Sequence, residues 1–547
     1  MLRAWVERYA ADEAVIRRAY PLETSAARWQ RLRALATAWQ GEMERLDWDA
    51  LKGDERVDAV LLENLLGRRL HEIERAEADA ARVRPHVAGL DLVLALEDDH
   101  RRHRRVDSRS VSAALAAVLA AYAALATDGP TQALASDPGL AQAVADAAGE
   151  AAGALDRWFA FYDGYDPVAT WWLREPVRRL GEALRAYETQ LGELAGRTAI
   201  TGVPIGEAAV RTELVDALVA HTPEELEALA QRELRFCRAE MVRAATEMGL
   251  GQDWRAALER VKETCVEPGD QPEVIYRLAE EACAFLENHD LVTVPPLADE
   301  TWRAEMMTPE RQRINPFFLG GEVIRISYPT DAMSHDQRRM SMRGNNPYFS
   351  RSTVFHELIP GHYLQQFMGE RQNRHRRLFH TPYWSEGNAF YWEMALWDMG
   401  FARTPEERIG MLFWRSHRAA RVLYTLAFHA GRMTTEEAVA LLVEEIGHEP
   451  DNASGEVRRL FQGHYGPLYQ CAYMVGAQQF YALRRELVVQ GGMAERAFHD
   501  AILAQGPMPV EVLRSVLTGR PVERGGPRWR FLDGRRRADR AKRPGPA

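Results

Sequence analysis

Cysteine is scarce in this chain of 547 residues, which contains only four. Cys237, Cys265, Cys283 and Cys471 lie far apart in the sequence, and no two of them form a Cys-x-x-Cys pair. A chain of this length does not need disulfides to supplement its hydrophobic core, so we expect four reduced, structural thiols. Reduced thiols favour a cytoplasmic location.

Long hydrophobic runs are also missing. The first eight residues, Met-Leu-Arg-Ala-Trp-Val-Glu-Arg, lead directly into mixed polar sequence without a continuous apolar stretch. We therefore expect no signal peptide. The segment 111–126 is apolar, but it is rich in alanine and shorter than a membrane span requires. It predicts a buried helix, and no membrane partner is expected.

Lysine is almost absent, because only Lys52, Lys262 and Lys542 are lysines among the 69 basic residues. The net charge is −10, and a content of 46% apolar and 27% charged residues is typical of a soluble globular protein. The run of charges at 98–105 has no aromatic residues between its arginines. It predicts a solvated helix end, and no nucleic-acid partner is expected.

The pattern of apolar residues predicts a mainly α fold. Apolar side chains recur every three or four residues through most of the first 300 positions. A Val-Thr-Val-Pro-Pro segment near 291–297 marks a composition change. We expect a two-lobed protein with a deep central cleft, an N-terminal helical lobe at 1–295 and a catalytic lobe at 296–519. The tail at 520–547 is rich in Gly, Pro and Arg, which predicts disorder.

One short β-strand is predicted at 322–328, where β-branched residues alternate with polar ones. It belongs to a small sheet beside the segment described next. The strand either offers its edge to an extended peptide or only packs against the neighbouring helix.

The segment 354–365, Val-Phe-His-Glu-Leu-Ile-Pro-Gly-His-Tyr-Leu-Gln, carries the chemistry. His356 and His362 supply two imidazoles, and Glu357 supplies a carboxylate, as a hydrolytic zinc site requires. Six residues turn an ideal helix through about 600°, which leaves the two rings roughly 120° apart. Pro360 and Gly361 lie between them, and we expect a kink there that brings His362 back toward His356.

A third ligand is expected downstream, in the aromatic segment 383–393. Glu386 follows His362 by 24 positions, a plausible distance for a helix, a turn and a second helix. Glu386 and Glu393 are seven residues apart and so share one helix face. One of them can bind the metal while the other orients a ligand or binds substrate, and the spacing leaves open which is which.

These segments resemble a known family. Residues 356–362 resemble the His-Glu-x-x-Pro-Gly-His-His motif of the bacterial family called domain of unknown function 885, and 386–393 resembles its Glu-Gly-Trp-Ala-Leu-Tyr-x-Glu motif. The resemblance covers most of 200–517. Further matching blocks are Arg418–Arg421 with His429, Glu456–Arg459, Gln470 with Tyr473–Gly476, and Phe498–Asp500 with Gly506 and Pro509.

The family is similar to the helical gluzincin peptidases, such as angiotensin-converting enzyme and thimet oligopeptidase. The resemblance implies that His356, His362 and Glu386 bind Zn²⁺ and that Glu357 is the general base. It also implies that Tyr473 and His429 polarise the scissile carbonyl. This sequence departs from the family motifs at Tyr363, Asn388 and 425–427.

The predicted activity is zinc-dependent hydrolysis of peptide or peptide-like amide bonds in short substrates. Two alternatives remain open: a zinc amidohydrolase that acts on a non-peptide small-molecule amide, and a non-catalytic peptide-binding protein. The presence of Glu357 argues against the second, because a protein that only binds has no use for a general base.

Overall fold

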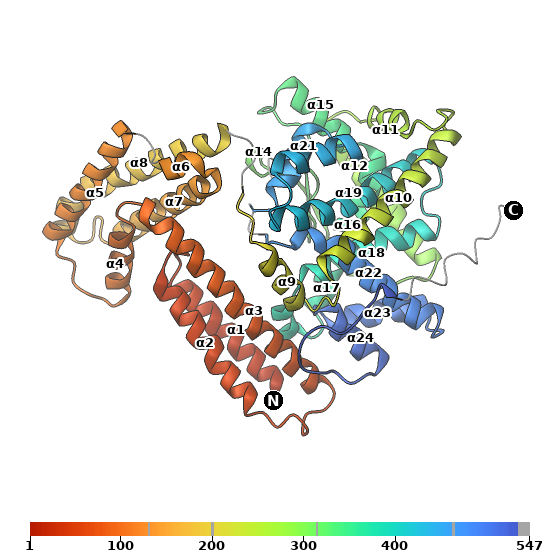
Figure 1. The fold of residues 1–547 in the computed structure, drawn as a ribbon, viewed down its shortest axis with the longest axis horizontal. Coiled ribbons are helices and arrows are strands. Elements are labelled where there is room, and N and C mark those ends of the chain that lie inside the picture. The colour runs from red at the N-terminus through yellow and green to blue at the C-terminus, as the bar shows by residue number, and fades with distance from the viewer. Residues whose placement is uncertain (129–131, 198–201, 313–314, 462–464, 534–547) are drawn as a thin grey trace. The chain divides into compact units, whose positions relative to one another are not determined.

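The computed structural model describes residues 1–128, 132–197, 202–312, 315–461 and 465–533 (Figure 1). Helices hold 71% of the structure and strands 2%, so the predicted mainly α class with one small sheet is confirmed. The chain forms two compact units. Unit 1 comprises 1–51 and 62–203, and unit 2 comprises 52–61 and 204–547. The lobe boundary expected near 295 therefore lies inside unit 2.

Unit 1 is all helical, with its core between the long helices α7 and α8. Small residues of α7, among them Ala145, Ala148 and Ala152, are fully buried, as are Leu173 and Leu180 of α8. Alanines on one face of α7 allow α8 to approach closely. The elements are α1 (Leu2–Ala19), α2 (Ala26–Glu44), α3 (Asp54–Val83, which begins in unit 2), η1 (Arg84–His86), α4 (Leu90–Arg101), α5 (Ser108–Asp128), α6 (Gln132–Ser136), α7 (Pro138–Ala160) and α8 (Pro167–Arg197).

Helix α5 contains the apolar segment that was expected to be buried. Leu115 and Tyr122 lie in the core of unit 1, but only 17% of the residues in 108–125 are buried. The helix is thus buried along one face only. By length and composition it is the one helix among the described residues that is able to cross a membrane, although core helices of soluble proteins pass the same test.

Unit 2 is also mainly helical. Its elements are α9 (Glu207–Asp216), α10 (Pro223–Glu247), α11 (Trp254–Lys262), α12 (Gln271–Asn288), α13 (Pro296–Thr301), β1 (Arg303–Met306), α14 (Pro309–Gln312), β2 (Val323–Ile326), α15 (His335–Gly344), α16 (Pro347–Glu357), α17 (His362–Gly369), η2 (Arg374–Phe379), α18 (Pro382–Asp398), α19 (Pro405–His429), α20 (Thr435–Ala440), η3 (Leu441–Ile446), α21 (Pro450–Arg458), α22 (Tyr469–Arg484), η4 (Arg485–Val489), α23 (Glu495–Gln505) and α24 (Val510–Thr518).

Side-chain caps fix where the two main helices of the candidate site begin. Asn346 Oδ1 accepts hydrogen bonds of 3.0 Å from the backbone N–H groups of Tyr348 and Phe349 at the start of α16. Thr381 Oγ1 accepts a bond of 3.2 Å from the Trp384 N–H at the start of α18. Each cap is followed by a proline at the first helical position, where no N–H is needed.

Helices α18 and α22 approach each other at a pair of glycines. A Cβ atom added to Gly387 would lie 2.6 Å from Gly476 Cα, and one added to Gly476 would lie 2.2 Å from the carbonyl oxygen of Tyr383. Any side chain at either position would push the helices apart. The glycine pair therefore allows the first half of α18 to pack closely against the middle of α22.

The small sheet is confirmed and consists of two parallel strands. β1 and β2 pair with Arg303 opposite Val323 and Met306 opposite Ile326. On the other edge of β2, Leu319 and Arg325 exchange backbone hydrogen bonds of 3.0 and 2.7 Å. At Arg325, β2 is thus paired with β1 on one edge and with Leu319 on the other. A peptide strand therefore cannot add to β2 at that position.

The tail differs from the predicted disorder over 520–533. Phe531 is only 3% exposed and lies 4.4 Å from the His221 ring, measured between centroids. Arg530 Nη1 donates to Glu225 Oε2 at 3.0 Å, and the Arg528 N–H donates to Glu511 Oε1 at 2.8 Å. This segment packs on unit 2 through an aromatic anchor that the Gly/Pro/Arg composition concealed. Residues 534–547 lie outside the described part of the chain.

Candidate metal centre

The helix that carries the first histidine ends between the two histidines. α16 stops at Glu357, and α17 starts at His362 after a cis peptide bond between Ile359 and Pro360. A Cβ atom at Gly361 would lie 1.8 Å from the carbonyl oxygen of His356, so only glycine fits there. The kink predicted from the proline and glycine is therefore a complete break, which separates two short helices.

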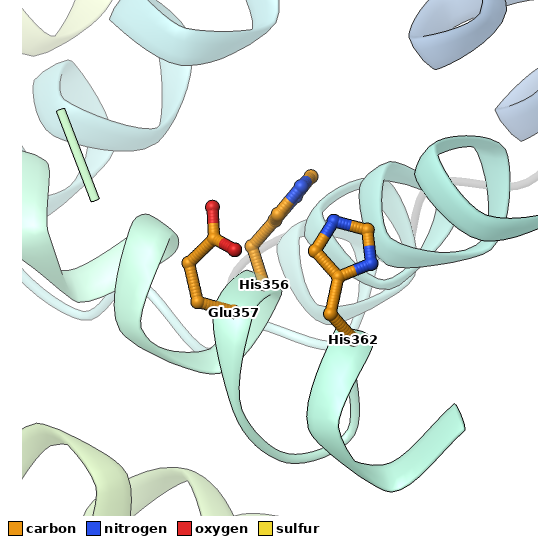
Figure 2. Close-up of side chains that lie close together, drawn as sticks. All are labelled: His356, Glu357 and His362. Atoms are coloured by element: carbon orange, nitrogen blue, oxygen red, sulfur yellow. The ribbon is translucent and has the colours of Figure 1, made fainter. Parts of the chain in front are cut away.

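This break brings the two imidazoles together. The rings of His356 and His362 are 4.9 Å apart between centroids and nearly perpendicular. Figure 2 shows them projecting with Glu357 toward the same space, from the end of α16 and the start of α17. One nitrogen or oxygen atom from each of the three side chains lies within 4.8 Å of the others. The spacing of six residues is thus compatible with one shared ion.

Glu386 of α18 contacts both imidazoles. Its Oε2 atom lies 3.4 Å from Nε2 of His356 and 3.0 Å from Nε2 of His362. Two carboxylates, those of Glu357 and Glu386, thus lie near the imidazole pair. Because one oxygen of Glu386 contacts both nitrogens, Glu386 is the better placed third ligand, and Glu357 remains available for another role.

The carboxylate of Glu386 and the two imidazoles shift each other's pKa values. Burial disfavours the charged forms, yet the Glu386 carboxylate raises the pKa of His362 to about 9. In turn, the two imidazoles outweigh burial and hold the pKa of Glu386 well below its usual range. Two nitrogens and one carboxylate oxygen are a donor set that zinc accepts in hydrolytic sites.

Glu393 contacts the opposite side of the His356 ring. Its Oε1 atom lies 2.8 Å from Nδ1 of His356, on the other nitrogen of the ring. Accepting the Nδ1–H proton fixes the tautomer and leaves the Nε2 lone pair free for a metal. Glu386 therefore lies on the Nε2 side of His356 and Glu393 on the Nδ1 side.

Glu357 lies beside the candidate ligands and against the loop before β2. A Cβ atom at Gly320 would lie 2.4 Å from Glu357 Oε2, so the glycine leaves room for the carboxylate. Burial raises the pKa of Glu357, and the neighbouring imidazoles of His362 and His356 oppose this shift. A carboxyl group with a raised pKa accepts and returns protons more readily near neutral pH, as a general base must.

Tyr473 lies against the first histidine of the candidate site. Its ring stacks on that of His356 with centroids 5.9 Å apart, and its hydroxyl oxygen accepts a hydrogen bond of 3.2 Å from Arg459 Nη2. Burial raises the pKa of Tyr473 to about 12, so the phenol keeps its proton. Because the oxygen accepts from an arginine, its own O–H remains available to a substrate oxygen.

Tyr469 is a site residue that the sequence reasoning missed. Its hydroxyl donates a hydrogen bond to Oε1 of Glu386, the oxygen that does not contact the imidazoles. Tyr469 and Tyr473 are one helical turn apart on α22 and both line the cavity. Residues four apart share one face of a helix, so the spacing of the two tyrosines is the sequence feature that could have identified Tyr469 once Tyr473 was a candidate.

His429 is not part of the site, which corrects the role expected for it. The cavity is lined by Arg418 and Arg421 of α19, whereas His429 ends that helix and is not among the lining residues. Eight further residues extend the helix by about 12 Å. His429 is buried, which lowers its pKa to about 4, so it is a neutral structural residue.

The site opens into a cavity of about 550 Å³. His356, Glu357, His362 and Glu386 lie on its wall with Tyr469, Tyr473 and several arginines. Neither Asn388 nor Thr425, which differ from the family motifs, is among the lining residues. Asn388 is buried and accepts a hydrogen bond of 3.1 Å from Gln365 Nε2, so its role is structural.

Solved structures similar to this chain include two bacterial proteins. A "putative lipoprotein of unknown function" from Shewanella oneidensis has a TM-score of 0.71 and 19% identity, over 95% of this chain and 100% of its own. A "putative lipoprotein" from Colwellia psychrerythraea has a TM-score of 0.61 and 15% identity, over 95% of this chain and 97% of its own. At these identities the similarity establishes the fold alone.

Among curated proteins, none matches this chain. The family described as "Bacterial protein of unknown function (DUF885)" matches residues 19–517, which cover most of both units and include every residue of the candidate site. The resemblance seen in the motifs therefore extends over most of the sequence, and the chain belongs to the DUF885 family.

Proposed function

We propose that this protein is a zinc-dependent hydrolase that cleaves peptide or peptide-like amide bonds in short substrates. The observation that carries the proposal is the contact of one Glu386 oxygen with the Nε2 atoms of both His356 and His362, beside the carboxylate of Glu357. Two histidines, a downstream glutamate and a base that adjoins the first histidine are also the features shared with helical gluzincin peptidases. The proposed similarity to those enzymes rests on these residues.

Zinc held by His356, His362 and Glu386 would act as a Lewis acid that makes water more acidic and the substrate carbonyl more electrophilic. Glu357 takes a proton from the attacking water and later delivers it to the leaving nitrogen. Tyr473 donates its O–H to the carbonyl oxygen as negative charge develops there. Glu393 keeps His356 in one tautomer and orientation throughout.

Hydrolysis of a non-peptide amide is the main alternative, and a pocket altered at Asn388 and Thr425, where the sequence departs from the family motifs, would favour it. Because neither lines the cavity, they give no reason to expect a different substrate class. The presence of Glu357 beside the ligand group also favours an enzyme over a protein that only binds peptides.

The proposal is tested with the full-length protein loaded with zinc and a mixed pool of short peptides, followed by mass spectrometry. Glu357→Gln keeps the size of the side chain but removes the base. We expect kcat to fall by about 10² to 10⁴ while zinc content and fold are retained. Hydrolysis by Glu357→Gln at the rate of the unmodified protein would refute the role of the base, and no product from any peptide would refute the activity.

The location of the protein needs a separate test. Both solved relatives are described as lipoproteins, which does not fit the cytoplasmic location that four free cysteines favour here. The proposed hydrolysis needs no cytoplasmic cofactor and suits either side of the membrane. Fractionation of cells that express the natural gene, with detection in the cytoplasmic and membrane fractions, decides between the two.

A further inference from the structure

Three arginines form one side of the cavity next to Tyr473. Arg418 and Arg421 extend from α19, and Arg459 follows the end of α21. The guanidinium carbons of Arg418 and Arg421 lie 4.8 and 4.2 Å from the centroid of the Tyr473 ring, and Arg459 bonds to the hydroxyl of the same tyrosine. We call Arg418, Arg421 and Arg459 the arginine wall.

The arginine wall is buried but not fully neutralised. Two carboxylates face it. Glu456 accepts bonds of 3.1 Å from Arg421 Nε and 3.2 Å from Arg459 Nη1, and Glu393 lies 3.4 Å from Arg418 Nη2. Glu393 is already bonded to His356. Three positive groups thus share two negative ones, one of which also serves the metal site.

Some N–H groups of the arginine wall also have no hydrogen-bond partner. Within the described part of the chain, Nε of Arg418 and Nε of Arg459 have no hydrogen-bond partner, although both side chains are more than nine-tenths buried. An unpaired guanidinium N–H in a buried position costs free energy, because the group has given up its hydrogen bonds to water. A buried cluster of three cations that shares two carboxylates, on the wall of a cavity, indicates a site that an anion completes.

We propose that the arginine wall binds a carboxylate of the substrate, so that the preferred substrates are short peptides with a free C-terminus or an acidic side chain. A guanidinium offers paired N–H groups that match a carboxylate. The wall and the candidate ligands line the same cavity, linked by the stack of Tyr473 on His356. This inference rests on the proposed function, because it concerns the same peptide substrate: the metal site acts on its amide bond, and the arginine wall binds its carboxylate.

Binding, measured apart from hydrolysis, tests it. The zinc-loaded Glu357→Gln protein is titrated calorimetrically with N-acetyl-trialanine, with its C-terminal amide, and with N-acetyl-Ala-Glu-Ala amide. We expect at least tenfold tighter binding of a peptide that carries a carboxylate than of the neutral amide. Preference for the first peptide identifies the C-terminus as the source, and preference for the third identifies a side chain. Equal affinity for all three peptides overturns the inference.

Variants locate the binding group. Arg459→Gln and Arg418→Gln should each reduce the preference for a carboxylate at least fivefold. Arg377→Gln is the matched control, because Arg377 lines the cavity but is paired with Glu370 at 2.6 Å. If both wall variants keep the preference, or if the control loses it equally, the wall is not the carboxylate site.

The outcomes separate this inference from the proposed function. Hydrolysis of neutral and acidic peptides at equal rates and with equal affinity refutes only the carboxylate site. A clear carboxylate preference without hydrolysis of any peptide by the unmodified protein refutes only the enzymatic activity. If a wall variant fails to fold, the comparison of acid and amide on the Glu357→Gln protein still decides the question.

Discussion

Nδ1 of His356 lies 2.8 Å from Oε1 of Glu393, while Nε2 of the same ring faces Glu386. The two carboxylates of α18 thus hold opposite nitrogens of one imidazole. Since α18 places both glutamates on one face, a single helix contacts both nitrogens of His356, as the proposed metal ligand and its orienting group would require.

Glu393→Gln should weaken zinc binding without abolishing it. A glutamine at this position bonds more weakly to Nδ1–H and holds the tautomer less firmly, so we expect zinc affinity to fall about 10- to 100-fold. Competition with a fluorescent zinc chelator measures the affinity. Unchanged affinity in Glu393→Gln would show that His356 needs no orienting carboxylate.

His362→Ala should remove bound zinc. The expected content is about one zinc per chain in the unmodified protein and close to none in the variant, by elemental analysis after dialysis. Tyr363→Phe is the matched control, because the Tyr363 hydroxyl bonds to Thr301 Oγ1 at 2.6 Å and takes no part in the ligand group. The assignment fails if His362→Ala retains as much zinc as Tyr363→Phe.

Removal of the tail after Gly519 should destabilise unit 2, whereas removal after Asp533 should not. The shorter chain loses Phe531, whose burial is worth about 1.5–3 kcal/mol. The ion pair between Arg530 and Glu225 is about 40% exposed and contributes less than about 1 kcal/mol. Thermal unfolding of both truncated chains makes the comparison.

Single substitutions should show the same order of effects. Phe531→Ala should lower the melting temperature clearly, and Arg530→Gln should lower it little. Equal melting temperatures for the chains that end at Gly519 and Asp533 would mean that the tail does not stay packed in solution.

The stability of unit 2 should fall as the pH drops below about 6.5. Burial lowers the pKa of His448 and of His499 to about 3. In the unfolded chain both groups bind a proton near pH 6.5, whereas in the folded protein they remain neutral until far lower pH. The unfolded state therefore gains protons first, which costs roughly 1 kcal/mol of stability per histidine and pH unit between 6.5 and 3.

Melting temperatures between pH 7.5 and 5 measure this dependence. In His499→Gln the slope should be smaller, because one of the buried histidines is gone. His335→Gln serves as the control, since His335 is exposed at the start of α15. A slope that is the same in both variants would show that His499 does not contribute to the pH dependence.

The sequence alone was sufficient for much of the candidate site, because the relevant signals are local. The pair His356-Glu357 and the following His362 are contained in one segment, and the intervening Pro360 and Gly361 disrupt a helix wherever they occur. The caps, the strand at 323–326 and the helical class also follow from neighbouring residues along the chain. None of these features needs a distant partner to form.

Other features depended on contacts between distant segments. Spacing placed Glu386 and Glu393 on one helix face, but only the packing of α18 against α16 and α22 determined which nitrogen of His356 each one meets. The same packing brought Tyr469 to Glu386, whereas the length of α19 carried His429 away from the cavity. In the tail, Phe531 finds a buried position near His221, about 300 positions earlier in the chain. Composition and periodicity describe a residue's neighbours along the sequence. The contacts named here depend on which distant segments pack against each other, and only the tertiary structure determines that packing.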